Sequence, residues 1–551
     1  MADTLGRDAR YAIRVLRKSP GFTSTAVLSL AMAVAINAAV FSIVDGVLLK
    51  PLPFPEPDRL LLMQATVEGG GERGERTSQH GVAWITVRDH ARTVDAAVFS
   101  TWAAGVNVVA GNRATHVDQQ KIGSGFFGVL GVQPLLGREF SPDEDRRGGP
   151  AAVILGHEFW LTTMGGDPSA VGRSITLRGA PHTVVGILPP GVPTGVKAEL
   201  WTPLRASTDG EGSGENFQIL LRLKAGASRA AADAEMEQLG PEINRLHPVP
   251  AGTTIAYGTV PLQQGLTDTL QQPLLMLWAA VAVVLLIACV NLAGLMFARG
   301  ARRSREFSTR LALGSGRIAL IRQLVVESAV LAVVGAGLGC ILGIFVLQGL
   351  TGLAENALEL WQPIALDARA VIGTVAVALV ATVIFGLIPA LYTTRVAAAG
   401  SAVGTRSIAG AASHLSRRTA VVVQVALGVM LLVGAGLLAR TFTHLRGLEP
   451  GFDGSGVHTA SVSLQDARYQ SAEDVRRLTV GALGRLSESA GVQSAAVSLG
   501  LPYERLLNLA FRHLDGREAG TQPSMTSATY IAGDYFGTLR IPVRDGRVFD
   551  T

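Results

Sequence analysis

Residues 299–322 read RGARRSREFSTRLALGSGRIALIR and connect two long apolar segments. The stretch contains seven arginines and a single acidic residue, Glu306. A segment with this charge must lie in water, and short loops of membrane proteins that are rich in Lys and Arg lie in the cytoplasm. We therefore expect this connector, residues 299–322, at the cytoplasmic face of a membrane.

The connector also carries the pattern of a short helix over residues 302–313. Phe307 and Leu311 are four residues apart on one face, and charged residues at the same spacing occupy another face. Gly314 follows and is suited to ending the helix. A short helix with two distinct faces is expected to present itself to a partner.

The composition is that of an integral membrane protein, since 48% of the 551 residues are hydrophobic and 17% are charged. An apolar helix of about 20 residues crosses a hydrocarbon core of about 30 Å. Five such spans are predicted, at about Phe22–Val44, Leu274–Ala298, Leu324–Leu350, Ala370–Tyr392 and Thr419–Ala439.

Positive charge gathers in three short segments, residues 1–22, 299–322 and 395–418. They hold five, seven and four Lys or Arg residues against two, one and no acidic residues. The positive-inside rule therefore places the N-terminus in the cytoplasm and residues 50–270 and 441–551 on the outer side. The same rule accounts for the basic pI of about 9.4, so nucleic-acid binding is not expected.

The first span is interpreted as an anchor because its apolar run is longer than the core of a cleaved signal peptide. Two readings of the preceding segment stay open. It is either an interfacial helix on the inner leaflet or a topology signal without a further role. The apolar stripe that favours the first reading consists of Leu5, Ala9, Ala12, Ile13 and Leu16.

The outer segment predicts a mixed α/β domain. Alternation or β-rich composition indicates strands at Ser174–Arg178, His182–Leu188 and Phe217–Leu223. Residues Ala230–Leu246 are rich in Ala and Glu and predict a helix after the third of these strands. The Gly-rich stretch Glu68–Arg76 is expected to be a mobile loop.

An internal repeat is visible in the outer segments. Residues 126–140 read FFGVLGVQPLLGREF, and residues 535–549 read YFGTLRIPVRDGRVF, with six identities at a constant offset of 409. Each copy also follows one membrane span with a basic cytoplasmic flank. The architecture is therefore expected to be a tandem duplication. The second copy stops at Thr551, which predicts either a fragment or a chain that has lost three spans.

This order of segments resembles the MacB/FtsX-type ABC transporter permeases, which have one span, a large outer domain and three further spans. The motifs that carry the resemblance are RYAIRVLRKSPGF before the first span, LLKPLPFPEPDRL after it, GGDPSAVGRSITLRGAPHTVVGILPPG in the outer domain and NLAGLMFARGARRSREFSTRLALGSGRIALIRQLVVESAVL across spans two and three. The duplication is similar to that of the ADOP subgroup, the tandem duplicated orphan permeases.

The resemblance implies an order of domains. It gives a cytoplasmic amphipathic segment at 1–22, span one at 23–49, a MacB-like extracytoplasmic α/β domain at 50–270, an FtsX-like permease domain with spans two to four at 271–394, a cytoplasmic linker at 395–418, span five at 419–440 and a partial second extracytoplasmic domain at 441–551.

The resemblance also implies that the helix at 302–313 is a coupling helix, which docks in a groove of a cytoplasmic ATPase. The residues expected to serve this contact lie on the helix or at its end: Arg302, Arg303, Arg305, Glu306, Phe307, Arg310, Leu311 and Gly314.

A nucleotide-binding P-loop needs a Gly-Lys-Ser/Thr sequence, in which backbone amides and the lysine hold phosphates. None of the five lysines of the sequence follows a glycine. No nucleophile motif or metal-ligand spacing of a hydrolase is visible either. We therefore expect no catalytic residue, no metal ligand and no cofactor in this chain, and ATP with Mg²⁺ is expected to act through a partner ATPase in two copies.

A few residues within the spans are expected to matter for packing or polarity. Asn291 and Glu327 are polar residues in apolar segments, and Glu327 is expected to pair with an arginine of the connector such as Arg322 or Arg317. Gly335, Gly339 and Gly343 recur every four residues, which suits close helix packing. The third span is therefore expected to be buried in the bundle.

Two functions stay open at this point. The first is a transport subunit of the bacterial inner membrane, in which a partner ATPase moves the outer domain to export or release a hydrophobic cargo. The second is a scaffold or sensor that regulates an envelope enzyme or a signalling partner. Membrane lipid is an expected partner of either, and a periplasmic partner is left open.

Overall fold

The computed structural model describes residues 2–69, 72–111, 113–194, 196–248, 252–313, 316–354, 364, 366–399, 406–462, 464, 467–469, 471–504, 507–511 and 524–549. The chain divides into two compact units. We call Met1–Leu52 with Leu266–Leu445 the helical unit, and Pro53–Gly265 with Arg446–Thr551 the sheet unit.

The helical unit is built from long helices. They are α1 (Ala2–Arg17), α2 (Pro20–Val44, continued by a π-helical turn at Asp45–Leu49), α7 (Leu262–Arg302), α8 (Ser304–Ala312), α9 (Arg317–Ala354), α10 (Ala368–Ala399) and α11 (Arg406–Arg446).

Four helices in the described part of the chain are long and apolar enough to cross a membrane, and these segments are Pro20–Leu49, Leu262–Gly300, Arg317–Gly352 and Val421–Arg446. Within α10 the described apolar part is the shorter segment Ala368–Ile384. Four of the five predicted spans therefore meet this criterion.

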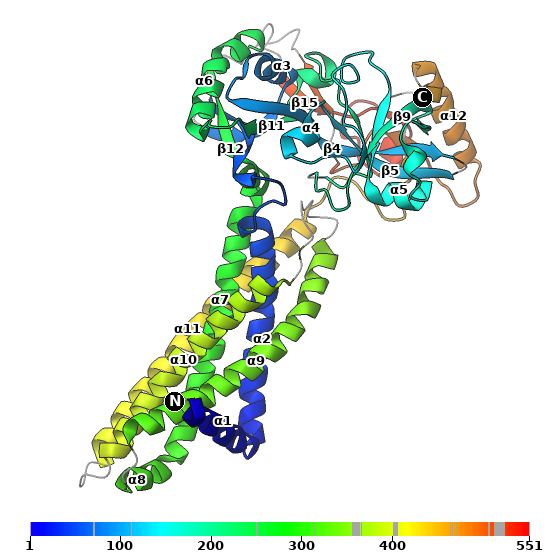
Figure 1. Ribbon diagram of the computed structural model, residues 1–551. Coiled ribbons are helices and arrows are strands. Elements are labelled where there is room, and N and C mark those ends of the chain that lie inside the picture. Colours follow the sequence, from blue (N-terminus) through cyan, green and yellow to red (C-terminus); the bar gives the residue numbers. More distant parts are fainter. Residues whose placement is uncertain are drawn as a thin grey trace. The chain divides into compact units, whose positions relative to one another are not determined.

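Close packing of α2 against α9 organises the bundle, and Figure 1 shows the two helices side by side. A Cβ atom at Gly335 would lie 2.9 Å from Cβ of Leu30, and one at Gly339 would lie 2.6 Å from Cβ of Val34. The glycines therefore allow an approach that a larger residue would prevent.

The opposite face of α9 differs from the prediction of a fully buried third span. Gly337 has no atom within 4 Å of its would-be Cβ, and Val333 and Phe345 are exposed. The four-residue glycine spacing defines one face only, so α9 is buried on its glycine side and open on the other.

Two boundaries also differ from expectation. The predicted helix at 302–313 begins later, because α7 continues to Arg302 and a turn at Arg303 precedes α8. Much of the predicted linker at 395–418 is helical, since α10 runs to Ala399 and α11 starts at Arg406. Alanine recurs in this segment and favours helix over loop.

The sheet unit contains a twelve-stranded mixed sheet in the order β12-β1-β11-β4-β5-β10-β7-β9-β6, with β2 paired to β1, β3 to β11, and β8 to β4 and β9. Its strands are β1 (Leu60–Gly69), β2 (Glu72–Arg76), β3 (Ser78–Gln79), β4 (Val94–Ala110), β5 (Arg113–Ile122), β6 (Leu136–Gly137), β7 (Ala152–Leu155), β8 (Ser174–Leu177), β9 (Ala180–Ile187), β10 (Leu200–Pro203), β11 (Phe217–Leu223) and β12 (Thr253–Pro261).

Two hydrophobic cores lie along this sheet, and the long strand β4 contributes to both. Val94 and Val98 pack in a core with the helices α3 (Gly81–His90) and α6 (Arg229–Leu246). Val106 and Val108 pack in a second core with α5 (His157–Met164). Figure 1 shows α3 and α6 at one end of the sheet and α5 at the other. Short 3₁₀ turns lie at Pro57–Arg59, Pro168–Ala170, Gly210–Ser213 and Ala467–Tyr469.

The mixed α/β character of this unit agrees with the prediction, and β11 has the predicted bounds. The predicted mobile loop at Glu68–Arg76 was wrong, because β1 and β2 form an antiparallel pair there. Arg73 lies 3.7 Å from carboxylate oxygens of both Glu68 and Glu75. Arg73 faces Glu68 across the pair and shares β2 with Glu75, so opposite charges lie together beside the glycines that suggested a loop.

The last part of the sheet unit holds α12 (Ala472–Ser487), β13 (Ala496–Ser498), β14 (Leu507–Phe511), β15 (Ser524–Ala528), β16 (Ile531–Gly533) and α13 (Tyr535–Thr538). The repeated motif has the same local fold in α13 and in α4 (Phe126–Leu130). The N–H of Val132 donates to the carbonyl of Phe127 at 2.8 Å, and Ile541 donates to Phe536 at the same distance. Leu130 and its counterpart Leu539 are both buried.

Candidate coupling site

An ion pair joins the connector to a buried residue of α9. Arg303 lies in the turn between α7 and α8, and its Nη1 is 3.1 Å from Oε1 of Glu327. The Glu327 side chain is 0% exposed and that of Arg303 is 15% exposed. A carboxylate in this position needs a charged partner, because an unpaired buried charge is strongly unfavourable. The predicted pairing of Glu327 with the connector is present, but its partner is Arg303, not Arg322 or Arg317.

Two further residues of the connector extend this ion pair into a network. Glu306 accepts from Nε of Arg303 at 3.0 Å and from Arg310 at 2.6 Å. Arg310 also donates to Gln323 at 3.1 Å, and Gln323 donates to Glu327 at 3.2 Å. Five side chains from α8, α9 and the turn thus form a closed ring of hydrogen bonds.

The charges in this ring change one another's pKa. The hydrogen bond from Arg303 is the main reason that the pKa of Glu306 is lowered, although burial opposes it. Burial lowers the pKa of Arg303, but its bond to Glu306 and the charge of Glu327 outweigh burial and raise it. Glu306 and Arg303 therefore stay charged at neutral pH.

The N-terminal helix α1 is attached to the same network. Oδ2 of Asp8 accepts from Nε of Arg322 at 2.6 Å. The hydroxyl of Tyr11 accepts from Arg310 at 2.9 Å, and the Arg310 guanidinium lies 5.6 Å from the Tyr11 ring centroid. Sequence reasoning missed both residues. Tyr11 was the detectable signal, since it is an aromatic residue on the polar side of a basic helix.

The apolar stripe of α1 behaves in part as expected. Ala12 and Leu16 are buried, whereas Ile13 is exposed, and the side chain of Leu5 lies outside the described residues. Arg299 donates to the carbonyl of Val15 at 3.2 Å. Helix α1 therefore packs within the helical unit, which neither reading of residues 1–22 included.

Phe307 points into the chain and not towards a partner. It is completely buried and packs with Leu320 and Leu324 of α9. The guanidinium of Arg303 lies 5.1 Å from its ring centroid. Phe307 therefore fixes α8 to α9, because its ring is covered within the same chain.

The exposed apolar residues of the connector lie on either side of its glycines. Leu313 is 82% exposed and Ile318 is 80% exposed. Large apolar side chains with this exposure are costly in water and are typical of interaction sites. Neither was predicted, although their position beside Gly314 and Gly316 in an arginine-rich connector is a signal visible in the sequence.

The other predicted residues lie as follows. Arg302 is exposed. Arg305 and Leu311 lie on α8, but their side chains are outside the described residues, as is Gly314 entirely. Asn291 is half-buried in α7. A Cβ at Gly343 would lie 3.3 Å from that of Ala38, so this glycine also faces α2.

Two protein families match the chain in consecutive order. The MacB-like periplasmic core domain matches residues 23–239, and the FtsX-like permease C-terminal domain matches residues 278–398. The chain belongs to the MacB/FtsX-type ABC transporter permeases. The family resemblance read from the sequence is thus confirmed. A permease of this type lies in the inner membrane with its core domain on the periplasmic side.

Relatives of this MacB/FtsX-type permease include export proteins. The pyoverdine export ATP-binding/permease protein PvdT of Pseudomonas fluorescens is 27% identical over 269 residues, 48% of this chain and 39% of PvdT. The macrolide export ATP-binding/permease protein MacB of Hahella chejuensis is 23% identical over 289 residues, 52% of this chain and 42% of MacB. The chain thus covers about two fifths of the length of each relative.

Among solved structures, the periplasmic region of MacB from Actinobacillus actinomycetemcomitans is similar to 38% of this permease and 91% of its own chain. The identity is 15% and the TM-score is 0.27.

Proposed function

We propose that this MacB/FtsX-type permease transmits motion from a separate cytoplasmic ATPase to its periplasmic domain, and that this motion exports or releases a hydrophobic cargo. The N-terminus and the connector would lie in the cytoplasm, and two ATPase subunits would serve the assembly. ATP and Mg²⁺ would bind to those subunits. Five spans would cross the membrane, α10 being the fifth beside the four long apolar helices.

The observation that carries the proposal is the ion pair of Arg303 and Glu327. It joins the connector to the fully buried side chain of Glu327 on α9. We call the exposed connector residues Leu313 and Ile318 its tip. A displacement of α8 without α9 would leave the Glu327 carboxylate buried and unpaired, at a cost of about 3–5 kcal/mol. The two helices are therefore expected to move together when a partner pushes on the tip.

The polar residues within the bundle support transmission of motion over conduction through a pore. Nδ2 of Asn37 donates to the carbonyls of Ala33 at 2.8 Å and Val281 at 3.0 Å, which joins α2 to α7. A hydrophilic pathway would need polar groups directed to water. Asn37 instead uses its donors to hold two helices together.

The internal repeat supports an assignment to the tandem duplicated orphan permeases. The repeated motif has the same backbone hydrogen bond in α4 and α13. Helix α11 precedes the second motif as α2 precedes the first. In the described apolar segment of α11, Val421–Arg446, no side chain is buried, whereas most side chains in the apolar segment of α2 are buried. We expect α11 to have the packing role of α2 against a second set of spans.

The proposal is tested with the full chain in lipid nanodiscs together with the ATPase that co-purifies with it. ATP hydrolysis and hydrogen exchange of residues 304–318 are measured with and without a non-hydrolysable ATP analogue. The proposal predicts stimulated hydrolysis and nucleotide-dependent protection of the connector. It fails if the connector exchanges equally in both states. A scaffold function would instead give nucleotide-dependent protection together with activation of an envelope enzyme and no change in export.

A further inference from the structure

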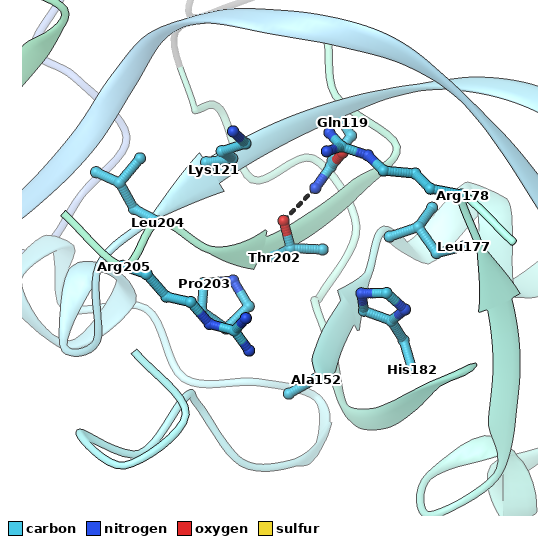
Figure 2. A pocket seen from close by; sticks show the side chains of 10 residues that line it. All are labelled: Gln119, Lys121, Ala152, Leu177, Arg178, His182, Thr202, Pro203, Leu204 and Arg205. Carbon is cyan, nitrogen blue, oxygen red and sulfur yellow. Dashed lines mark hydrogen bonds between the residues drawn. The ribbon is translucent and has the colours of Figure 1, made fainter. Parts of the chain in front are cut away.

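The sheet unit contains a basic pocket of about 230 Å³ that the coupling function does not use. It lies among β5, β10 and the turn from β8 to β9. Its lining includes Lys121, Arg178, His182 and Arg205, and none of its described lining residues is acidic. Figure 2 shows His182 and Arg205 on opposite sides of the pocket, with Thr202 and Ala152 between them. A hollow lined by several cationic groups and no carboxylate favours an anion.

The strand pairing explains why polar side chains gather here. Gln119 and Lys121 are two residues apart on β5 and therefore share one face of the sheet. The parallel neighbour β10 places Thr202 opposite Lys121. The Gln119 amide donates to the Thr202 hydroxyl (Figure 2) and accepts from Arg178. These bonds hold the floor of the pocket in one arrangement.

Arg205 is fixed in place without a carboxylate partner of its side chain. Its Nε donates to the carbonyl of Glu144 at 3.2 Å, and its Nη2 donates to the carbonyls of Gly149 at 2.7 Å and Pro150 at 2.8 Å. Among the described residues its guanidinium forms no ion pair. Its backbone N–H donates to Asp145 at 2.7 Å. The guanidinium charge is thus held rigidly beside the pocket.

The backbone of both pocket arginines is unusual. Arg178 has a φ of 55° and Arg205 a φ of 52°, in the left-handed region that residues other than glycine seldom adopt. For Arg178 the cause is the two-residue turn that it forms with Gly179 between β8 and β9, since such hairpin turns have positive φ at both positions. The turn and the bonds of Arg205 thus fix the backbone from which each guanidinium extends.

His182 adds a neutral hydrogen-bond acceptor to the cationic groups of the pocket. Its Nδ1 lies 3.0 Å from the carbonyl of Ala180, and a carbonyl only accepts, so Nδ1 carries the hydrogen in this contact. Burial is the main cause that lowers the pKa of His182, and the charges of Arg178 and Arg205 lower it further. The bond to Ala180 raises the pKa but does not outweigh them. The imidazole is therefore neutral at pH 7, and Nε2 is an acceptor. An oxyanion with an O–H group can donate to Nε2 while its other oxygens face the cations.

We propose that this pocket binds a phosphate group, carried either by a small soluble molecule or by a lipid headgroup. A phosphate group presents three oxygens that share up to two negative charges, which suits Lys121 and the two arginines. Inorganic hydrogen phosphate also has an O–H for His182, whereas a phosphate monoester binds through its three oxygens alone. A carboxylate has two oxygens and one charge and uses fewer of these groups. The pocket lies in the periplasmic core domain and is independent of the ATPase coupling proposed above.

The test uses the full chain in detergent micelles and isothermal titration with inorganic phosphate at constant ionic strength. We expect one binding site, with affinity reduced about tenfold or more in Arg178→Gln and Arg205→Gln, as loss of a charged hydrogen bond predicts. Arg147→Gln is the matched control, because Arg147 is 87% exposed and pairs with Asp209 outside the pocket. Lys121→Met serves as a second variant if the Arg205 substitution unfolds the 144–150 loop.

Parallel titrations separate the sources of the phosphate. Tighter binding of glycerol 3-phosphate than of phosphatidic acid added to the same micelles indicates a soluble ligand, and the reverse order indicates a lipid headgroup; either result supports the proposal. Binding of acetate as tight as that of phosphate would overturn it. So would equal affinity in the Arg178 and Arg147 variants, or no binding by any phosphate compound at 10 mM, about the weakest affinity of practical interest.

Discussion

Nη1 of Arg303 lies 3.1 Å from the carboxylate of Glu327, a side chain with no solvent exposure. Arg303 belongs to the turn that precedes α8, and Glu327 is a residue of α9. Their ion pair joins the connector to α9, and the proposed function requires the two to move together. Glu306 and Gln323 complete the hydrogen bonding on either side of the pair.

Removal of one partner of this ion pair should destabilise the helical unit. Arg303→Ala leaves Glu327 buried without its hydrogen-bonded cation, so we expect the free energy of unfolding to fall by about 3–5 kcal/mol. Glu327→Gln keeps a hydrogen-bond acceptor and should cost about 1 kcal/mol. Denaturant unfolding of the full chain in detergent measures both.

Two comparisons make this result specific. Arg73→Ala removes an exposed arginine that lies 3.7 Å from its carboxylate partners and should change stability by less than about 1 kcal/mol. Arg303→Met combined with Glu327→Leu should be close to wild type, because no buried charge is then left unpaired. Equal losses in Arg303→Ala and Arg73→Ala would show that burial of the pair is unimportant.

The glycine face of α9 gives a prediction with its own internal control. A Cβ at position 339 would lie 2.6 Å from Cβ of Val34 and 2.8 Å from the carbonyl oxygen of Ala31. Gly339→Ala should therefore destabilise the α2–α9 contact by about 1–3 kcal/mol. Gly337→Ala meets no atom within 4 Å and should be neutral or slightly stabilising. A thermal unfolding series that ranks the two variants the other way would contradict this packing.

The sheet unit should lose stability in mild acid through His80. This imidazole caps α3 by accepting from the N–H of Ala83 at 3.2 Å and stacks on His247, with ring centroids 4.0 Å apart. Burial, with the charges of His247 and Arg76, lowers the pKa of His80 from 6.5 to about 4. Between these values the unfolded chain binds a proton that the folded chain does not, so stability falls as the pH falls.

The size of this effect is about 3 kcal/mol between pH 6.5 and pH 4. His80→Asn keeps a side chain that caps helices well and removes the titration. Hydrogen exchange of α3 should therefore accelerate on acidification in the wild type much more than in the variant. The same acid dependence in both proteins would exclude His80 as its source.

The sequence alone predicted those features that show as a local pattern of residue types. Apolar length located four of the five predicted spans, β-rich composition located β11 with its observed bounds, and the four-residue spacing of Gly335, Gly339 and Gly343 located the face that meets α2. Each of these patterns depends on residues within one element, so the sequence of that element is enough to predict it.

The arrangement of the connector could not be predicted in the same way. Phe307 and Leu311 showed an apolar face, but not that α9 of the same chain covers Phe307. The partner of Glu327 depended on a turn at Arg303 that local propensity does not reveal. Tyr11 reaches Arg310 across 299 residues of sequence. Such contacts are set by the packing of whole helices.

The exposed tip of the connector is the contact on which the proposed function depends. The double variant Leu313→Asp with Ile318→Asp changes two exposed side chains outside the network of Arg303 and Glu327. Leu246→Asp is its control, because Leu246 is 50% exposed at the end of α6 in the sheet unit. All proteins are reconstituted in nanodiscs with the co-purifying ATPase, and their thermal unfolding midpoints are compared first.

The most direct measurement is the stimulation of ATP hydrolysis by the permease in these samples. Loss of two central apolar contacts predicts a reduction of about tenfold or more in the double variant, with unchanged unfolding, and wild-type stimulation in Leu246→Asp. Wild-type stimulation in the double variant would contradict the claim that the ATPase acts on this permease through residues 299–322.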